Sequence, residues 1–552
     1  MQAVGVLTVH AIALVSLQVL AVPEAVHPEL TVRHVVETAT GSQAIRLVSD
    51  PADDTLYYLN QSGTIYRLTI PPQGAASTEL LYTSGDTGVS SPQGFAIGGD
   101  GNFYVTGNET QEKNTVATVR RGVLLNAGSE EREWTTVART VPYPRSDIFD
   151  HLVNGIAVSP DSEYLFVNSG SRTDHGELQS NGGMFPGLRE APLTAIFLKI
   201  PAAGQDIVLP DDPSALEAAG YLFASGLRNS FDPAFSPEGE LFSGENSGDR
   251  DDSEEINWIR QGRHYGFPWR MGTNDTPQQF PGYDVEADPL VNHNYPAYMN
   301  GFFVDDPTFP PSPGGFTDPV VNRGPDANSF RDASGEVQDA SDTGGTISTL
   351  TAHRSPLGLV FDVEGALGAE FRRDGFITAW TTGNAAGDSA TGPFKDPGED
   401  LLHLTFSKVG NAYEVETRRI VRGFNHPVDA AIVGHRIYVL EHGGSGSVWE
   451  VTFPAFEPPP FVRGFINLDD ALDLSDAITL LFHLFLGGAV PCRDAADSND
   501  DGSLDIADAI YILSYLFQGA AAPPPPFTVC GEDLTVDEND GDLGCDQAPP
   551  CP

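Results

Sequence analysis

The sequence has 552 residues and a mass of 59.0 kDa, with 30 Lys and Arg against 77 Asp and Glu, which gives a formal net charge of −47 at pH 7. A field of this sign repels phosphate backbones and anionic lipid, so it argues against nucleic acids and membrane surfaces as partners and suits cations and neutral substrates. Apolar residues make up 40 % of the chain, which is enough to bury a sizeable core.

The first 22 residues are almost wholly apolar and carry no charged side chain. This run predicts a secretory signal over residues 1–25, with Ala21 or Ala25 as the cleavage position. A basic segment ahead of it is missing, so a buried strand or a retained anchor is the alternative. No later stretch is long and apolar enough for a membrane helix. We therefore expect an exported protein, bacterial and secreted or at the cell surface or periplasm, with no membrane segment after cleavage.

Six similar hairpin patterns follow in residues 26–456. Each has an apolar strand, a short turn at Asp, Gly or Asn, and a second apolar strand, with the two-residue period of β-structure. The patterns begin at Ile45, Gly94, Gly155, Asp232, Leu357 and Val428. Units of about four strands repeated six times are typical of a propeller, so we predict an all-β, six-bladed β-propeller, with a β-sandwich array as the alternative. A Pro-, Asp- and Asn-rich insertion from about residue 266 to 346 is predicted to form loops over one face.

The fourth pattern carries the longest motif of the body. It reads Gly226-LRNSFDPAFSPEGELFSGENSGDRDDSEEINWIRQGRHYGFPW, with GLRN ahead of the hairpin and EEIN and YGFPW after it. These parts together resemble the soluble glucose/sorbosone dehydrogenase family, whose members are six-bladed propellers that use pyrroloquinoline quinone (PQQ). The segments Pro92-QGFAI, His353-RSPLGLVFD and Asn425-HPVDAAIVG extend the resemblance over residues 30–454.

The resemblance implies roles for five residues that precede or begin hairpins. His151 would be the general base that takes a hydroxyl proton as hydride leaves for PQQ, and the neighbouring Asp150 would orient its ring. Arg228 would face the quinone oxygen that becomes negative, where a guanidinium stabilises charge. Asn229 and Gln93 would line the same pocket. Taken by themselves, the histidine is a loop residue, the arginine a salt-bridge partner and the glutamine a hairpin residue.

An acidic loop, Glu245-NSGDRDDSEE, ends the same hairpin. Calcium prefers carboxylate and carbonyl oxygens. The resemblance places the backbone carbonyls of Ser247 and Gly248 on a calcium ion that is held against the cofactor. A stretch of this composition is also typical of a solvated loop, and that alternative stays open.

The fifth hairpin departs from the family pattern. Members that hold PQQ use a lysine and arginines there to bind its carboxylates. The segment Trp380-TTGNAAGDSATGPFKDPGEDLLHLTF has one lysine, Lys395, and no arginine. Lys395 is therefore the predicted contact to a cofactor carboxylate. Glu399 and Asp400 in the same segment would repel the carboxylates of the cofactor. Ser171 also stands where the family has an acidic residue.

After a Pro-rich linker at residues 457–462 the composition changes. Two segments repeat, Asp473-LSDAITLLFHLFLGG and Asp505-IADAIYILSYLFQGA, and each follows an acidic loop. The pair resembles a type I dockerin, an α-helical twin calcium-loop (EF-hand-like) module of secreted proteins, over residues 463–522. The resemblance implies a calcium-dependent attachment module with a cohesin-like or surface partner.

The second acidic loop has the spacing of an EF-hand calcium loop, with Gly502 at the sharp turn. Its five side-chain ligands would be Asp497, Asn499, Asp501, Asp505 and Asp508. The first loop is eroded, because Phe465 and Asp470 stand where a ligand and the glycine are expected. Its remaining ligands would be Asn467, Asp469, Asp473 and Asp476. The aromatic residues that follow both loops at helical spacing are predicted to form the core between two helices, with partner docking as the alternative; they are Phe482, Phe485, Tyr511, Tyr515 and Phe517.

All four cysteines lie near the C-terminus, at Cys492, Cys530, Cys545 and Cys551. In an exported chain this favours two disulfides, and the shortest loops favour Cys492–Cys530 with Cys545–Cys551. A zinc site is the alternative, although paired CxxC motifs are missing. Residues 523–552 are predicted to be a Pro- and Cys-rich acidic tail.

These patterns together predict an exported PQQ-dependent sugar or aldose dehydrogenase-like protein, with PQQ and calcium as cofactors and a small sugar or polyol as substrate. A non-catalytic propeller that binds carbohydrate or protein and is displayed through its tail is the alternative. A hydrolytic, lactonase-like propeller is a third reading, for which the sequence shows no clear set of axial ligands.

Overall fold

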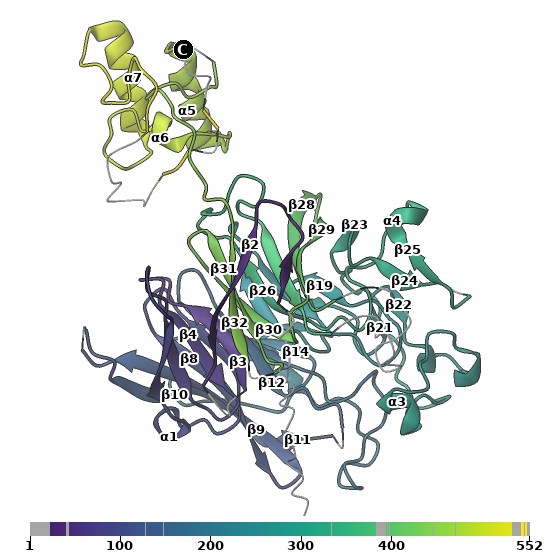
Figure 1. Cartoon of the computed structure of the whole chain (residues 1–552). Coiled ribbons are helices and arrows are strands. Elements are labelled where there is room, and N and C mark those ends of the chain that lie inside the picture. Colours follow the sequence, from purple (N-terminus) through teal and green to yellow (C-terminus); the bar gives the residue numbers. More distant parts are fainter. Residues whose placement is uncertain are drawn as a thin grey trace, which may run out of the picture. The chain divides into compact units, whose positions relative to one another are not determined.

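The computed structural model of the chain describes residues 22–39, 43–126, 128–146, 148–332, 334–381, 394, 396, 398–444, 446–469, 471–532, 543–545 and 547–548. The chain divides into two compact units, Met1–Ala455 and Phe456–Pro552 (Figure 1). The predicted signal at residues 1–25 falls almost entirely outside the described residues, as do Lys395, Asp470 and Cys551. Among the described residues, no helix combines the length and the apolar character needed to cross a membrane.

Six sheets of three to six strands make up most of the first unit. Blades one to three contain β3 (Ala44–Ser49), β4 (Leu56–Asn60), β5 (Ile65–Thr69) and β6 (Ser77–Tyr82); β7 (Pro92–Ile97), β8 (Phe103–Gln111), β9 (Asn114–Leu124) and β10 (Arg132–Thr140), with β11 (Tyr143–Pro144) and β15 (Ile207–Leu209) at the edges; and β12 (Val153–Val158), β13 (Tyr164–Ser169), β14 (Ile196–Pro201), β16 (Leu222–Ser225) and β20 (Arg263–His264).

Blades four to six contain β17 (Asp232–Phe235), β18 (Leu241–Glu245) and β19 (Glu255–Trp258); β26 (Pro356–Phe361), β27 (Gly375–Ala379), β28 (Asp400–Val409) and β29 (Ala412–Arg422), with β1 (Glu24–Ala25) and β23 (Val321–Pro325) at the edge; and β30 (Pro427–Val433), β31 (Arg436–Glu441), β32 (Ser447–Thr452) and β2 (Thr31–Glu37). The short helices of this unit are α1 (Ser84–Thr87), α2 (Pro213–Ala218), η1 (Pro277–Gln279), η2 (Val285–Ala287), α3 (Pro296–Met299) and α4 (Ala340–Thr343). Two small hairpins, β21 (Arg270–Met271) with β22 (Asn274–Asp275) and β24 (Ser329–Arg331) with β25 (Val337–Asp339), lie in the insertion after blade four.

The first strand of each hairpin pattern is the inner strand of a blade. β3 neighbours β7, β7 neighbours β12, and the series continues through β17, β26 and β30 back to β3. A closed ring of six inner strands defines a six-bladed β-propeller, so the predicted architecture is confirmed (Figure 1). The insertion consists largely of loops with short elements, also as predicted.

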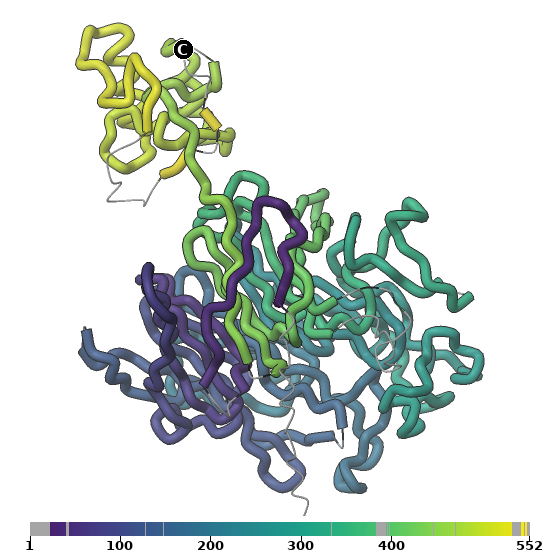
Figure 2. The backbone as a smooth tube through the Cα atoms, in the orientation of Figure 1, coloured from purple at the N-terminus to yellow at the C-terminus, as the bar shows by residue number. Residues whose placement is uncertain are grey.

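The sixth blade takes one strand from the beginning of the chain. β2 pairs antiparallel with β32, so that Thr31 lies opposite Thr452 and His34 opposite Trp449. Figure 2 shows this N-terminal segment running along the last strands of the propeller. The pairing closes the ring with a hydrogen-bonded ladder. The sequence analysis did not find β2, because a single strand without its own hairpin turn gives no local signal.

Inner strands of adjacent blades approach so closely that side chains are excluded at some positions. A Cβ atom at Gly94 on β7 would lie 2.1 Å from the carbonyl oxygen of Asn154 and 2.9 Å from the side chain of Ile156. Buried apolar residues of both blades fill the surrounding space, including Tyr104, Val119, Ile156, Val167 and Leu198. Glycine here allows the backbone of blade two to contact that of blade three.

The described residues of the second unit form two longer helices, each preceded by a loop, and one short helix that comes between them in the chain. α5 (Leu474–Leu486) and α7 (Ile506–Gln518) each begin with a capping box, in which the N-cap aspartate and the aspartate three residues later exchange hydrogen bonds. α6 (Arg493–Ala496) lies between them. The buried core consists of Ile466, Ala477, Leu480, Ala496, Ala509 and Ile512.

The predicted aromatic core of this unit is wrong for three residues. Phe482, Phe485 and Phe517 are 52 %, 66 % and 68 % exposed, because smaller residues on the facing sides of the helices form the contact instead. Tyr511 and Tyr515 are half-buried, and the ring of Tyr515 contacts Phe527 edge to face.

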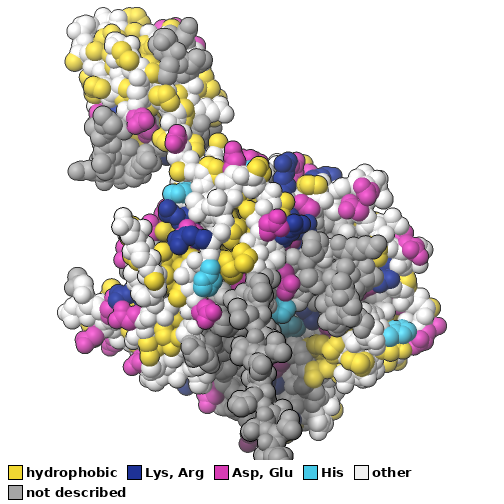
Figure 3. Space-filling model, viewed as in Figure 1, with side chains coloured by type: hydrophobic (Ala, Val, Ile, Leu, Met, Phe, Trp, Pro, Cys, Tyr) yellow, Lys and Arg dark blue, Asp and Glu magenta, His cyan; other side chains and the backbone are white. Residues whose placement is uncertain are grey.

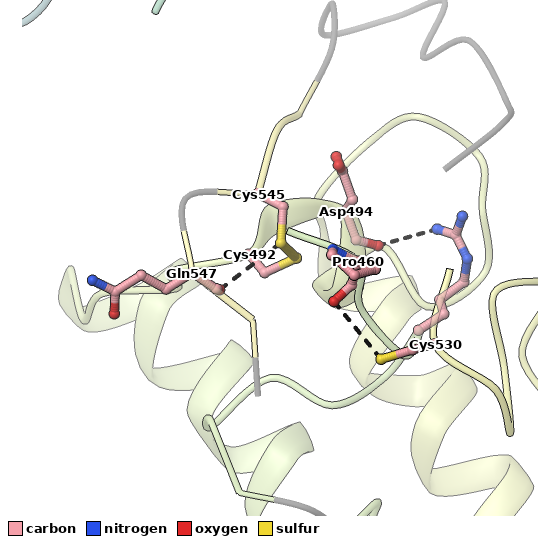
Figure 4. Close-up of a disulfide and its surroundings, with 7 residues drawn as sticks. Pro460, Cys492, Asp494, Cys530, Cys545 and Gln547 are labelled. Atoms are coloured by element: carbon pink, nitrogen blue, oxygen red, sulfur yellow. Dashed lines mark hydrogen bonds between the residues drawn. A yellow bond between two sulfur atoms is a disulfide. The ribbon is translucent and has the colours of Figure 1, made fainter. Parts of the chain in front are cut away.

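The predicted disulfide pairing is also wrong. Cys492 is bonded to Cys545 rather than to Cys530 (Figure 4). An isolated bridge brings the backbones of Cys492 and Cys545 together, and the backbone N–H of Arg493 donates to the carbonyl of Gly544. Cys530 is disulfide-bonded as well and lies beside Pro460. The Cys492–Cys545 disulfide therefore closes a longer loop than the pairing that was predicted from the shortest loops.

Replacing Gly94 with Ala is expected to lower the free energy of unfolding of the propeller by about 1–3 kcal/mol, because the new methyl group meets a backbone carbonyl that cannot move aside. Gly99→Ala in the same hairpin is the matched control. Its Cβ would lie 3.5 Å from the Ser162 hydroxyl, so a change within about 0.5 kcal/mol is expected. Urea unfolding followed by tryptophan fluorescence measures both, and equal effects of the two substitutions would show that the inner strands are not packed this closely.

Candidate functional site

The residues predicted to carry chemistry lie at the N-terminal ends of the inner strands. Gln93 is on β7, His151 precedes β12, and Arg228 and Asn229 precede β17. The side-chain amide of Asn154 on β12 donates to Asn229 at 2.8 Å, which joins two of these ends. Because ring closure brings all six inner strands around one axis, their N-terminal ends meet at one face of the propeller.

His151 is held by Ser171 at the end of β13. Its Nδ1 lies 3.1 Å from both the carbonyl oxygen and the Oγ of Ser171. The Ser171 hydroxyl itself donates to the carbonyl of Thr173, so Nδ1–H is the donor to the Ser171 carbonyl and Nε2 carries the lone pair. Burial and the nearby Arg228 guanidinium lower the pKa of His151 to about 3. The ring is therefore neutral at neutral pH, as a proton acceptor must be.

Asp150 makes no hydrogen bond to the ring of His151 in the described structure. Its carboxylate accepts a hydrogen bond from Arg145 Nε at 3.0 Å, and burial raises its pKa. The contact that orients the imidazole comes from Ser171 and not from Asp150, which corrects the predicted orienting role. Phe149 and Leu152 flank the pair with left-handed φ angles of 71° and 61°, a costly conformation that the surrounding structure must enforce.

Arg228 is buried against Asp174, a residue that the sequence analysis missed. Its Nη2 lies 2.9 Å from Asp174 Oδ1 and its Nε donates to the Asp174 carbonyl at 2.8 Å. The same carboxylate contacts the ring of His175 at 2.8 Å and accepts from the backbone of Asp249. Burial alone would raise the pKa of Asp174, but the hydrogen bond from His175 and the charge of Arg228 outweigh it and lower the pKa. The sequence offered one signal for Asp174, namely that an acidic residue stands three positions after Ser171.

The EEIN motif supports the GLRN turn through Glu245. Glu245 accepts the backbone N–H of Arg228, and the side-chain amide of Asn257 donates to Glu245 at 3.0 Å and to Glu255 at 2.7 Å. Burial raises the pKa of Glu245 well above its usual value and that of Glu255 to about 7. The motif thus positions Arg228 through a buried network of hydrogen bonds.

Ser247 and Gly248, the predicted calcium-binding positions, lie beside Asp174. A Cβ at Gly248 would come within 3.0 Å of the Asp174 carboxylate. The side-chain oxygens of Ser247 and Asn246 are buried and have no hydrogen-bond partner in the described structure. Orphaned oxygens of this kind suit a hard cation. The described residues nevertheless contain no group of three or more His, Cys, Asp or Glu side chains that could hold a metal ion.

Two arginines of blade five lie near the same face, and the sequence analysis did not consider them. Arg354 precedes β26 and Arg419 lies on β29. Arg354 is fully buried and pairs with Asp396 and Asp400, and Arg419 Nε lies 2.6 Å from Asp400. Both charges are therefore neutralised by acidic partners, and the predicted carboxylate contact, Lys395, lies outside the described residues.

His353 is a second imidazole that the sequence analysis quoted in a motif but assigned no role. Its Nε2 lies 2.8 Å from Asp251, whose carboxylate also pairs with Arg331 at 2.6 Å. Burial would lower the pKa of His353, but the hydrogen bond and charge of Asp251 outweigh it and raise the pKa. Tyr295 of the insertion packs on the His353 ring at 4.8 Å. The insertion therefore covers part of this face, as the sequence predicted.

The middle and C-terminal parts of the inner strands line a different cavity, of about 280 Å³, whose lining also includes Asp232 and Asp429. Arg46 on β3 contacts the backbone of two other blades. Its guanidinium donates to the carbonyls of Gln93 and Phe231 and lies 3.6 Å from Asp232. Because these partners belong to blades two and four, Arg46 reaches across the ring and supports the backbone beneath Gln93.

A model of the glucose/sorbosone dehydrogenase family matches residues 98–299, which include His151, Arg228, Asn229 and the signature blade. This match confirms the predicted resemblance over that part of the chain. No curated protein matches the chain in sequence.

Several solved structures are similar in fold. The PQQ-bound aldose sugar dehydrogenase of Streptomyces coelicolor is 17 % identical, with a TM-score of 0.44 over 78 % of this chain and 99 % of that one. The apo-form of the soluble aldose sugar dehydrogenase of Escherichia coli is 14 % identical, with a TM-score of 0.46 over 77 % and 99 %. The holo form of the PQQ domain of pyranose dehydrogenase from Coprinopsis cinerea is 13 % identical, with a TM-score of 0.47 over 78 % and 97 %.

Asp174→Asn is expected to destabilise the propeller by about 3–5 kcal/mol, because it leaves the buried Arg228 guanidinium without its counter-charge. Asp275→Asn, at an exposed position in the insertion, is the control and should change stability by less than about 0.5 kcal/mol. Thermal unfolding followed by circular dichroism compares the two. A mild effect of Asp174→Asn would mean that Arg228 is not buried as described.

Proposed function

We propose that the propeller is a PQQ-dependent dehydrogenase of a sugar or related polyol. The observation that carries this proposal is His151, a neutral imidazole whose Nδ1 is fixed by Ser171 and whose Nε2 can accept a proton. The family match over residues 98–299 supports it. A proton acceptor with an adjacent guanidinium suits the removal of a hydroxyl proton from a neutral substrate.

In this proposal the chain's own residues position the substrate and move its proton. Ser171 keeps the imidazole of His151 in one tautomer, and Nε2 takes the proton of the hydroxyl that is oxidised. Asp174 and Glu245 fix Arg228, which supplies positive potential near the reacting atoms without side-chain motion. PQQ, when bound, supplies the two-electron acceptor that takes the hydride.

The fit of this face to PQQ differs between the two parts of the cofactor. His151, Arg228 and the orphaned oxygens at Asn246 and Ser247 suit its reacting end and an associated calcium ion. Its carboxylates would need cations, and the arginines described at blade five are paired with aspartates. Lys395 is the remaining cation that the sequence offers there.

A titration of the calcium-loaded protein with PQQ, together with an assay of pyranoses using an artificial electron acceptor, tests the proposal. We expect saturable binding and turnover. His151→Ala is expected to lower kcat/KM by about 10²–10⁴-fold, because a positioned base is lost. His435→Ala, in the turn between β30 and β31, is the matched control. Absence of PQQ binding would favour the alternative, a non-catalytic propeller that binds carbohydrate or protein.

The pH dependence gives a separate test of the base. Because the pKa of His151 is about 3, its ring stays neutral through the mildly acidic range and charges only well below the ordinary histidine value. The profile of kcat/KM is therefore expected to lack an acidic limb with a midpoint near the ordinary histidine pKa of about 6.5. An acidic limb with a midpoint near this value, seen both in the wild type and in His435→Ala, would contradict the described environment of His151.

We further propose that the second unit is a calcium-dependent, dockerin-like attachment module of an exported protein. In its second loop Asp497 accepts the backbone N–H of Gly502 at 2.9 Å, and Asp508 accepts that of Asp505 at 2.9 Å. Burial, with the charge of Asp497, raises the pKa of Asp508 to about 7. The carboxylates of Asp497 and Asp508 are close enough for one to raise the pKa of the other, and such a pair favours a bound cation.

The surface of α5 and α7 supports attachment. Apolar side chains are exposed on both helices at corresponding positions of the repeat, and they are Leu474, Ile478 and Phe485 on α5 and Ile506, Ile510 and Phe517 on α7. Figure 3 shows apolar side chains on the surface of this unit. An exposed apolar face of a helix pair suits a protein partner, and a cohesin-like domain is the partner that the resemblance implies.

Calcium is expected to stabilise this unit by about 2.7 kcal/mol at a concentration 100-fold above its Kd. Asp497→Asn should strongly weaken the effect, because it removes the negative charge of the first-position ligand. Asp469→Asn in the first loop is the control and should keep the effect of the second loop. Calorimetric titration and thermal unfolding with and without a chelator measure both, and an unfolding temperature insensitive to calcium would rule the site out.

A further inference from the structure

The chain just before the second calcium loop belongs to α6 (Arg493–Ala496). Cys492 is the N-cap of this helix, and Asp497, the predicted first ligand of the loop, is its C-cap. The backbone N–H of Asp497 donates to the carbonyl of Arg493 at 2.9 Å, so Asp497 is held against the helix. The position of the first ligand therefore depends on the contacts that hold α6 in place.

Tail residues hold α6 at its N-terminal end. The Cys492–Cys545 disulfide joins the two segments, and the backbone N–H of Arg493 donates to the carbonyl of Gly544 at 2.9 Å (Figure 4). Both cysteines are buried in a small cluster whose other members are Ala495 and Phe461. The tail at residues 543–545 is therefore packed against α6 and is part of the folded unit.

Arg463 contacts the helix, the loop and the tail together. Its Nη1 donates to the carbonyls of Asp494 and Asp497 at 3.1 and 2.7 Å, and its Nη2 pairs with Asp500 at 2.8 Å. Its Nε donates to the carbonyl of Pro525 in the tail at 3.2 Å. Because a guanidinium is planar and rigid, these contacts fix the backbone of Asp497 relative to α6 and the tail.

The burial of Arg463 sets it apart in a strongly acidic part of the chain. From Phe461 to Pro552 the sequence has 17 Asp and Glu, two Arg and no Lys. The other arginine, Arg493, is exposed, whereas Arg463 is 0 % exposed. Burying a guanidinium is costly unless hydrogen bonds and a counter-charge compensate, and here backbone carbonyls and Asp500 do so. Asp500 is not among the predicted calcium ligands, so this ion pair leaves the charge of the ligands available to a cation.

Asp497 in turn orders the loop that follows it. Its carboxylate accepts the backbone N–H of Asp501 at 3.2 Å and that of Gly502 at 2.9 Å. Asp501 is itself a predicted ligand, and Gly502 forms the sharp turn with a φ of 75°. A loop that already has the conformation of the bound state loses less entropy when it binds its ligand, so its affinity is higher.

We propose that Arg463 and the Cys492–Cys545 disulfide form a clamp that fixes the second loop in its calcium-binding conformation, so that the calcium affinity of this loop depends on both. Arg463 is a positioning residue, because it acts through the backbone of Asp497. The bound calcium rests on the proposed function of the second unit. The clamp itself rests on the contacts between α6, the loop and the tail.

Arg463→Lys in the full-length protein tests the clamp, because lysine keeps the positive charge but presents one nitrogen in place of the three of a guanidinium. Arg493→Lys, at the exposed arginine of α6, is the matched control. Calorimetric titration with calcium measures the Kd of the loop, whose binding heat is recognised because Asp497→Asn weakens it. We expect Arg463→Lys to raise this Kd about tenfold, the loss expected for one charge-assisted hydrogen bond, and Arg493→Lys to leave it unchanged.

The double variant Cys492→Ala with Cys545→Ala tests the disulfide arm of the clamp. We expect it to raise the Kd at least tenfold, because α6 loses its covalent connection to the tail. Protection of the α5 and α7 amides against hydrogen exchange, measured at saturating calcium, shows whether the unit still folds. If the double variant does not fold, the Kd of Arg463→Lys decides.

Hydrogen exchange without calcium separates the clamp from the proposed function. The amides of Asp501 and Gly502 should exchange about tenfold faster in Arg463→Lys than in the wild type, while α5 and α7 keep their protection. Loss of protection in both helices would show a general loss of structure and overturn the positioning role.

The two proposals fail in different ways. A wild type that binds calcium at this loop, with the same Kd in Arg463→Lys, overturns the clamp and leaves the calcium module intact. A wild type that binds no calcium there overturns the calcium module and the proposed dependence of its affinity. Unchanged exchange of the loop amides in Arg463→Lys then shows that Arg463 does not fix the loop either.

Discussion

The pairing of β2 with β32 is the constraint on which the rest of the propeller depends. It joins β2, a strand near the beginning of the chain, to the last blade and so closes a ring whose inner strands are in mutual contact. Only in a closed ring do the N-terminal ends of six strands face one axis. The connections that carry His151, Arg228 and His353 come from three different blades, and closure is what brings them to a common face.

That face contains several buried ion pairs. Asp174 pairs with Arg228, Asp251 lies between His353 and Arg331, and two aspartates pair with Arg354. Breaking a buried pair costs far more than replacing it, so these pairs fix side-chain positions more than they add stability. In a chain with many more acidic than basic residues, most arginines find a carboxylate, and this explains why cations for an anionic cofactor are scarce here.

The two units present different kinds of surface. The face around His151 is polar, enclosed and partly covered by the insertion, which suits a small neutral substrate. The helices of the second unit expose apolar side chains around acidic loops, which suits a protein surface and a cation. The two proposed functions, oxidation of a neutral sugar by one unit and attachment to a protein partner by the other, require no large positively charged surface, in agreement with the composition.

The sequence by itself determined the six hairpins, the signature motif of blade four and the spacing of the second acidic loop, because turn residues and strand or helix periods are local properties. It also indicated His151 and Arg228, since both lie in or beside long motifs. Tertiary structure decided what depends on contacts distant in the chain. It assigned β2 to the last blade, Asp174 to Arg228, Ser171 rather than Asp150 to the imidazole, and Cys545 to Cys492.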